Sequence, residues 1–434
     1  GCMKSMTAPL NRKMYFLTDP IEDRAKDWLD YKINYQATFA AQLMYPMVDT
    51  YEVMPWPDRI YQGLYRIAGT DQKERIPRSY STQMQTMINT LNDIRTSDKK
   101  ITGTQGIGVL MANSLMFQRF PNHNGYDDPQ FSSFYGQTLP LLKRGIPVEL
   151  VHMENTPFKE TFKGLHILVM SYSNMKPMKP EYHNYLADWV KKGGILIYCG
   201  EDIDPYQTVL EWWNTDGNEY KAPSEHLFEK MNLSRNPGEG TYRYGKGTVI
   251  VMREDPKHFV LKAGNDQKYF ETIASAYQKK IGKEIETKNS FIVERGPYTI
   301  AAVMDESVSK EPLTLSGLYI DLFDKDLPVL TSKQIQPGEQ GYLYDLNKVS
   351  GKIKAKVLCG ASRIYDEKVS KQSYSFVAKS PINTTNVSRV LLPRKPEKIR
   401  VNGKEEQPEW DESSKTLLLS FENDPAGVNV SIEW

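Results

Sequence analysis

The 434-residue sequence has only three cysteines, no long apolar run and almost no net charge. Cys2, Cys199 and Cys359 stand far apart, which excludes a dense disulfide framework and the closely spaced ligand pairs of a structural zinc site. No run of about 18 apolar residues is present, so the sequence predicts no transmembrane helix. The 55 Lys and Arg residues against 54 Asp and Glu residues leave a formal charge of +1. This balance provides no bulk attraction to nucleic acid or to an anionic membrane.

The amino-terminal residues allow more than one cellular location. Gly1-Cys2 has two interpretations, an internal cleavage site or an added glycine before the first mature residue of a lipoprotein. No signal peptide is visible. The cleavage site is the simpler interpretation. We expect a periplasmic or extracellular protein, with lipid anchoring through Cys2 as the alternative.

Length and the order of local patterns predict three domains. At about 150 residues per domain, a chain of this length accommodates about three. Residues 1–100 have the pattern of βα units followed by a helix, and residues 101–285 alternate apolar strands with helices. Residues 286–434 consist of short strands separated by turns. We find no internal repeat and no low-complexity segment.

The first segment contains two predicted strands joined by a helix. Apolar runs at 14–18 and 50–54 predict short strands. Between them, apolar residues recur at spacings of three and four over 28–44, which predicts an amphipathic helix. A further helix is predicted over 79–94.

The second segment has the pattern of a doubly wound α/β domain. Continuous apolar runs joined by amphipathic helices predict a parallel sheet covered on both faces. Right-handed crossovers then give a flavodoxin-like arrangement. We predict a closing hairpin over 240–252 and a helix over 267–281. The predicted strands lie at 107–112, 147–151, 166–170 and 195–198, and the predicted helices at 131–143 and 180–192.

The third segment predicts an antiparallel β-sandwich. Short runs recur about every ten residues with turn residues between them, and several alternate apolar with polar residues. Asn402-Gly403, which stands between two such runs, is a strong signal for a two-residue hairpin turn. The predicted fold class is therefore α/β plus all-β.

The doubly wound segment lacks a recognisable nucleophile. Nucleophilic catalysis on such a sheet needs a Cys or Ser on a sharp strand-to-helix turn, with a His and an acid nearby. The strand at 166–170 instead enters Ser171-Tyr-Ser-Asn-Met175, without a Gly-x-Cys-x-Gly or Gly-x-Ser-x-Gly motif. Cys199 follows the next strand, one crossover too late, and we expect it to be a small buried residue. An intact amidotransferase-like or esterase-like enzyme is therefore a weaker hypothesis than the two functions described below.

Nothing in the sequence predicts a bound cofactor or metal ion. The glycines of 103–108 precede a strand, whereas a phosphate loop follows a strand and opens a helix. The six His residues have no pair spacing typical of a zinc site. Asp321, Asp324 and Asp326 form an acidic turn with two interpretations, a Ca²⁺ site or a solvated turn, and we expect the solvated turn.

Carboxylates gather at the first two predicted strands. Asp19, Glu22 and Asp23 follow the first strand, and Glu52 lies within the second. Glycoside hydrolysis uses two strand-end carboxylates, one to protonate the leaving oxygen and the other to attack or to activate water. A complete (β/α)₈ barrel takes about 250 residues, far more than precede the doubly wound segment. A structural remnant of a barrel is therefore at least an equal alternative to a catalytically active site.

The order of these parts resembles that of family-42 beta-galactosidases. The stretch from Asp19-Pro-Ile-Glu-Asp23 through residues 31–46 to Tyr51-Glu-Val-Met-Pro-Trp-Pro-Asp-Arg-Ile60 resembles the last barrel units of large glycoside-hydrolase-like proteins from gut bacteria of the Bacteroidetes type. Residues 166–170 and 185–198 resemble the class I glutamine amidotransferase-like domain that follows the barrel in that family and mediates trimerisation. The final all-β segment resembles the small sandwich that closes such enzymes.

This resemblance implies a partial (β/α) barrel, an amidotransferase-like domain and a β-sandwich. It implies a glycoside hydrolase or its carboxyl-terminal half, with Glu52 as the first choice and Glu22 as the second choice for a catalytic acid. The implied partner is a carbohydrate, and the doubly wound domain is expected to form a homo-oligomer; neither a cofactor nor nucleic acid is implied. The implied substrate-binding residues are Asp19, Asp23, Trp56, Asp58 and Tyr61. The alternative is a non-catalytic assembly or glycan-binding module with a degenerate amidotransferase-like domain.

Overall fold

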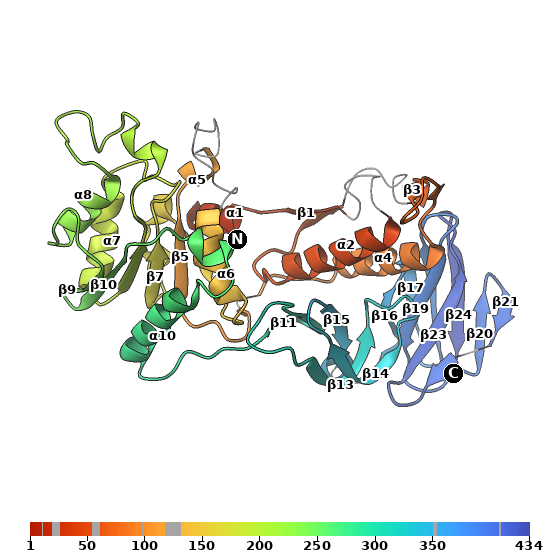
Figure 1. The fold of residues 1–434 in the computed structure, drawn as a ribbon. Helices are drawn as coiled ribbons and strands as arrows, with labels where there is room; N and C mark the ends of the chain where they lie inside the picture. Colours follow the sequence, from red (N-terminus) through yellow and green to blue (C-terminus); the bar gives the residue numbers. More distant parts are fainter. Residues whose placement is uncertain are drawn as a thin grey trace. The chain divides into compact units, whose positions relative to one another are not determined.

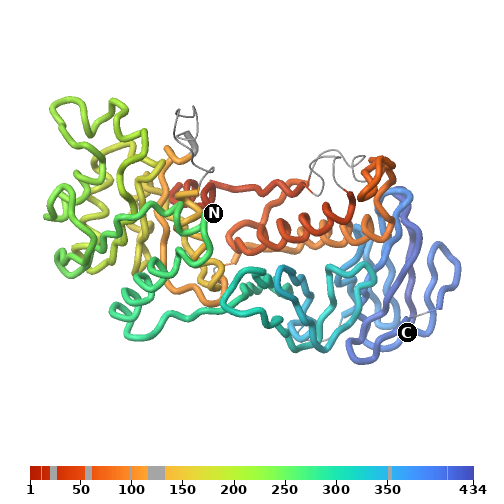
Figure 2. The backbone as a smooth tube through the Cα atoms, viewed as in Figure 1, coloured from red at the N-terminus to blue at the C-terminus, as the bar shows by residue number. Residues whose placement is uncertain are grey.

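The computed structural model describes residues 1–10, 12–19, 27–53, 61–97, 99–117, 132–349, 354–407 and 409–434. These residues form two compact units, and Figure 2 follows the chain through both of them. The first unit consists of Gly1–Met14, Gly103–Asn289 and Glu306–Ser309. The second unit consists of Tyr15–Thr102, Ser290–Asp305 and Lys310–Trp434. Each unit is therefore assembled from segments that are separated in the sequence.

A six-stranded sheet lies at the centre of the first unit (Figure 1). Its strand order is β6-β5-β7-β8-β10-β9, in which β9 is antiparallel to β10 and the other neighbours are parallel. This is the flavodoxin-like order with one added antiparallel edge strand. The prediction of a doubly wound sheet is confirmed. The strands are β5 (Ile107–Met111), β6 (Glu149–His152), β7 (Ile167–Met170), β8 (Ile195–Cys199), β9 (Gly240–Tyr244) and β10 (Gly247–Met252).

Helices cover both faces of this sheet, because its strands bury side chains on both sides. Leu168 of β7 belongs to an apolar cluster that includes residues of α7 and α8. Its neighbour Val169 belongs to a second cluster with residues of α6, α9 and α10. Burial on both faces explains why these strands are continuous apolar runs in the sequence. The helices are α1 (Cys2–Thr7), α5 (Ser114–Phe117), α6 (Ser132–Leu142), α7 (Tyr182–Lys191), α8 (Pro223–Lys230), α9 (His258–Leu261) and α10 (Gln267–Ile281), and the 3₁₀ helices are η1 (Ala8–Leu10), η2 (Met153–Asn155), η3 (Lys159–Phe162) and η4 (Pro205–Thr208).

The second unit begins with a parallel β-α-β arrangement. Strands β1 and β2 pair in parallel, and helix α2 lies between them in the sequence. The side chain of Asp27 caps α2 by accepting hydrogen bonds from the amides of Leu29 and Asp30. The elements are β1 (Phe16–Thr18), α2 (Trp28–Leu43), β2 (Tyr51–Val53), the antiparallel pair β3 (Tyr65–Arg66) and β4 (Lys73–Glu74), and α4 (Arg78–Thr90).

Three antiparallel sheets complete the second unit. Their orders are β11-β12-β15-β13-β14, β16-β19-β23-β22 and β17-β18-β24-β20-β21. The last two sheets share one apolar core and form the predicted sandwich. The predicted hairpin joins β20 to β21, with Asn402 and Gly403 both at positive φ. The bounds are β11 (Ser290–Arg295), β12 (Tyr298–Val303), β13 (Leu313–Asp321), β14 (Val329–Ile335), β15 (Gln340–Asp345), η5 (Leu346–Lys348), β16 (Lys356–Gly360), β17 (Arg363–Val369), β18 (Ser373–Lys379), β19 (Thr385–Leu391), β20 (Lys398–Val401), β21 (Lys404–Glu406), β22 (Glu409–Asp411), β23 (Thr416–Glu422) and β24 (Val428–Glu433).

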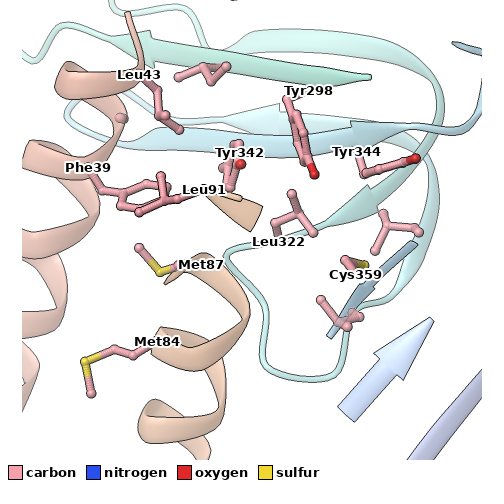
Figure 3. Close-up of a cluster of buried hydrophobic side chains, with 14 of the residues drawn as sticks. Phe39, Leu43, Met84, Met87, Leu91, Tyr298, Leu322, Tyr342, Tyr344 and Cys359 are labelled. Atoms are coloured by element: carbon pink, nitrogen blue, oxygen red, sulfur yellow. The ribbon is translucent and has the colours of Figure 1, made fainter. Parts of the chain in front are cut away.

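Helices α2 and α4 bury their apolar faces in a core shared with the β11-β12-β15-β13-β14 sheet (Figure 3). The ring of Phe39 on α2 meets that of Tyr342 on β15 edge to face, with centroids 5.5 Å apart. Tyr342 stacks on Tyr298 of β12 at 5.6 Å, and its hydroxyl donates a hydrogen bond of 2.9 Å to Oγ1 of Thr90. Residues 15–102 thus belong to the same compact unit as the antiparallel sheets.

Candidate functional site

The exposed carboxylate Glu52 lies on the face of the β1–β2 pair that is turned away from α2. Glu52 is the register partner of Leu17, and both side chains are exposed. The opposite face is turned to α2, since Thr18 is buried and its Oγ1 donates a 2.9 Å hydrogen bond to the hydroxyl of Tyr35 on that helix. Successive side chains of a strand point to opposite faces, so Leu17 and Glu52 point away from α2. The carboxylate of Glu52 makes no hydrogen bond or ion pair with any residue that the structure describes.

A parallel β-α-β arrangement with one face under a helix is the repeating element of a (β/α) barrel. In the β1–β2 pair, the face away from the helix bears Leu17 and Glu52. In the described part of the second unit this face carries a leucine that is 56% exposed beside a free carboxylate. The arrangement can therefore present Glu52 to a ligand without a competing partner.

The structure locates three of the seven residues predicted at this site. Asp19 follows β1 directly, and Glu52 is the middle residue of β2. Tyr61 is half-buried against the apolar core, and burial raises the pKa of its hydroxyl. Its ring therefore packs on the protein along much of its surface. The other four, Glu22, Asp23, Trp56 and Asp58, lie outside the described residues.

The carboxyl edge of the doubly wound sheet holds a second group of polar side chains. Lys176 and Asp204 form a buried ion pair, with Nζ and Oδ2 2.7 Å apart and side chains 3% and 1% exposed. The hydroxyl of Ser173 donates to Oδ1 of Asp255, which also accepts a 3.1 Å hydrogen bond from the amide of Glu201. These groups satisfy one another, as buried polar atoms must. None of these four side chains is therefore left as an unpaired acid or base for catalysis.

This edge does not assemble a nucleophile with a base. Ser173 contacts a carboxylate directly, with no imidazole between them. The buried His183 is engaged elsewhere, with Nε2 2.5 Å from the hydroxyl of Tyr172 and Nδ1 2.8 Å from Nδ1 of His226. Cys199 is fully buried at the end of β8, and burial strongly raises the pKa of its thiol, so the thiol is protonated at neutral pH.

The Lys176–Asp204 pair and the Tyr172–His183–His226 series were not predicted from the sequence. A signal was present for Asp204, because it stands shortly after a buried strand, as Asp19 does. The histidines are 43 residues apart in the sequence, and no local pattern links them.

Two of the three aspartates in the predicted acidic turn pair with lysines. Asp321 is buried and pairs with Lys333, with Oδ2 and Nζ 2.7 Å apart, and Asp326 pairs with Lys325 at 2.5 Å. Among the residues with a described structure, no group of three or more His, Cys, Asp or Glu is arranged to hold a metal ion. In the same described ranges, no helix is long and apolar enough to cross a membrane.

Comparison with solved structures finds distant similarity to GH42 beta-galactosidases. Gan42B from G. stearothermophilus, as a catalytic mutant, matches over 79% of this chain and 60% of its own, with 10% identity and a TM-score of 0.40. The beta-galactosidase of Bacillus circulans sp. alkalophilus matches over 61% of this chain and 43% of its own, with 10% identity and a TM-score of 0.36. The beta-galactosidase of the psychrophilic Marinomonas ef1 matches over 73% of this chain and 49% of its own, with 10% identity and a TM-score of 0.36.

The chain spans about half the length of these enzymes. No family model and no curated protein matches the sequence.

Proposed function

We propose that the chain is part of a carbohydrate-active protein of the glycoside hydrolase type, in which Glu52 serves as one of two carboxylates. The observation that supports this proposal is the exposed, unpartnered carboxylate on the helix-free face of a parallel β-α-β arrangement. Asp19 at the end of the adjacent strand supplies a second acidic side chain. Glu22, the second choice for a catalytic acid, follows four residues after Thr18.

The chemistry needs two carboxylates on either side of one glycosidic bond. Their separation is about 5 Å in retaining enzymes and about 6.5–9.5 Å in inverting enzymes. Adjacent strands lie about 4.8 Å apart, so acids on neighbouring strand ends reach the same sugar ring. In this proposal one acid protonates the leaving oxygen and the other attacks the anomeric carbon or activates water.

The test is hydrolysis of aryl glycosides and plant oligosaccharides by this chain and by any longer polypeptide that contains it. Glu52→Gln is expected to lower kcat by at least about 100-fold, the smallest rate contribution usual for a positioned general acid or base. Glu74→Gln is the matched control, because Glu74 is an exposed carboxylate in the same unit but on β4. Equal activity of the two variants, or no hydrolysis by any form of the protein, would refute the catalytic proposal.

The second candidate function is a non-catalytic assembly role for the doubly wound unit. It is favoured by the mutually satisfied polar groups at the carboxyl edge of the sheet and by the buried, protonated Cys199. The segment after β8 also exposes apolar side chains, with Ile203 70% and Leu210 82% exposed. An interface between copies of the chain would bury these two side chains.

The mass of the protein in solution tests this second function. We expect an oligomer that Leu210→Asp dissociates. Leu261→Asp is the control, since Leu261 is 54% exposed on α9 of the same unit. A wild-type protein that remains monomeric at high concentration contradicts the assembly role.

A further inference from the structure

A pocket of about 420 Å³ opens in the second unit, between the end of α4 and the strands β16 and β17. Its volume is in the range of small-molecule sites, about 300–1,000 Å³. None of its lining residues belongs to β1, α2 or β2. It is therefore separate in sequence from the proposed catalytic acids. The polar and aromatic lining residues used below are Asn89, Asn92, Asp93, Lys356, Arg363, Tyr365 and Glu367.

The two strands that line this pocket are both irregular at the lining positions. The pairing of β16 with β19 shifts register between Val357 and Cys359, and that of β17 with β18 shifts between Tyr365 and Lys368. Asp366, inside the second irregularity, has a positive φ of 53°. β-Bulges redirect side chains and are common next to binding sites. Here they redirect the backbone where Tyr365 and Glu367 line the pocket.

Three partly buried hydrogen bonds hold the floor of the pocket in place. The fully buried Tyr374 donates its hydroxyl proton to the carboxylate of Glu367 and accepts a 3.3 Å hydrogen bond from the amide of Val357. Asn89 of α4 donates a 3.0 Å hydrogen bond from Nδ2 to the carbonyl of Gly360. The pocket is thus preformed, which lowers the entropic cost of binding.

The lining groups favour a neutral ligand with several hydroxyls. Lys356 and Arg363 contribute two positive charges, and Asp93 and Glu367 contribute two negative charges, so the lining has no net charge. Among the described residues, the side chains of Arg363 and Lys356 have no hydrogen-bond or ion-pair partner. Guanidinium and carboxylate groups bind vicinal hydroxyls through paired hydrogen bonds.

The aromatic residue of the pocket fits the same ligand class. Tyr365 is 44% exposed, and Nζ of Lys379 lies 5.5 Å from its ring centroid. An exposed aromatic ring beside hydrogen-bonding groups offers an apolar surface to the C–H face of a sugar and leaves its hydroxyls for the polar groups.

We propose that this pocket is a binding site for a neutral saccharide unit, separate from the proposed catalytic acids. The choice of a saccharide over other neutral polyols rests on the proposed function. The site itself rests on the pocket, its two bulges and its balanced charges.

The experiment is titration calorimetry of the whole chain with galactobiose, xylobiose, cellobiose and mannobiose, and with digalacturonate as the anionic probe. We expect saturable binding of at least one neutral disaccharide and weaker binding of digalacturonate. Arg363→Ala and Tyr365→Ala are each expected to weaken binding about tenfold, a loss typical of one hydrogen bond to a charged group or one aromatic contact.

The matched controls lie on the same strand but outside the pocket. Lys368→Ala removes an exposed cation of β17, and Val369→Ala trims a side chain that is 54% exposed. Both controls are expected to bind like the wild type. Binding that neither pocket variant weakens, tighter binding of digalacturonate than of every neutral probe, or the absence of saturable binding would each overturn the proposal.

Glu52→Gln separates this inference from the proposed function. A chain that binds a disaccharide through Arg363 and Tyr365 but hydrolyses nothing refutes the catalytic role and supports the pocket. A chain that hydrolyses glycosides through Glu52 while the pocket variants bind normally refutes the pocket and leaves the catalytic role intact.

Discussion

Leu17 and Glu52 are register partners in the parallel β1–β2 pair, on the face away from α2. Both side chains are exposed, whereas Thr18, the residue after Leu17, is buried on the face turned to α2.

Leu17→Ser is expected to change the free energy of unfolding by no more than about 0.5 kcal/mol, the usual limit for exposed positions. Phe39→Ala, in the core under the same sheet pair, is expected to cost about 3–5 kcal/mol. Urea unfolding of both variants checks the contrast. A cost for Leu17→Ser as large as that of a buried leucine would mean that this face is covered in solution.

Stability of the first unit is expected to fall as the pH is lowered below about 6.5. Burial first, and then the charges of His226 and Lys230, hold the pKa of His183 well below its usual value; burial also lowers the pKa of His226. In the unfolded chain these histidines bind protons near pH 6.5, whereas in the folded chain they do not. Lowering the pH through this range therefore favours the unfolded state, and the free energy of unfolding decreases. The slope is up to about 1.4 kcal/mol per pH unit for each histidine.

Urea unfolding between pH 7.5 and 5.5 measures this slope. His183→Gln is expected to reduce it, because glutamine does not titrate. His258→Gln is the control, since His258 lies on α9, away from the hydrogen bonds that join Tyr172, His183 and His226. Identical slopes for wild type and His183→Gln would contradict this assignment.

Thiol labelling of the native protein at pH 7.5 is expected to modify Cys2 before Cys199 and Cys359. Cys199 and Cys359 are buried, and burial raises the pKa of the Cys359 thiol to about 12. The partly exposed Cys2 is the accessible thiol of the three. Mass spectrometry after labelling in buffer and in denaturant gives the comparison. Rapid native labelling of Cys199 would instead support the amidotransferase-like alternative.

Tyr342→Phe is expected to destabilise the second unit by about 1 kcal/mol, because it removes the hydrogen bond to Thr90. Tyr342→Ala also removes the ring that contacts Phe39 and Tyr298 and is expected to cost about 3–5 kcal/mol. Tyr365→Phe, at an exposed position, serves as the control. An equal loss of unfolding free energy in Tyr342→Phe and Tyr342→Ala would mean that the hydroxyl, rather than the packed ring, provides the stabilisation at this position.

Several features could be predicted because they depend on neighbours in the sequence. The strands around Leu168 and Val169 bury both faces, so they are apolar without interruption, and this pattern alone predicts a covered parallel sheet. The turn at Asn402-Gly403 needs positive φ at two successive residues, which that pair accepts. The absence of a nucleophile motif after Met170 is likewise a local property.

Other features depend on contacts between distant segments. The periodicity over 28–44 predicts a helix, but only the tertiary structure shows that Phe39 packs on Tyr342. Tyr61 lies outside that periodic stretch, and only the tertiary structure shows that it is half-buried against the core. For Glu22, Asp23, Trp56 and Asp58 the strand-end position remains a prediction.

The sequence by itself determined the buried parallel strands and the amphipathic helices α2 and α10, because those choices follow from the local period of apolar residues. Only the tertiary structure decided which face of β1–β2 is open at Glu52, and that Asn89 meets Gly360 across 271 residues of chain to build the pocket. The physical reason is that burial and partner choice are set by the free energy of the whole packed unit. Residues that are adjacent in sequence do not encode that packing.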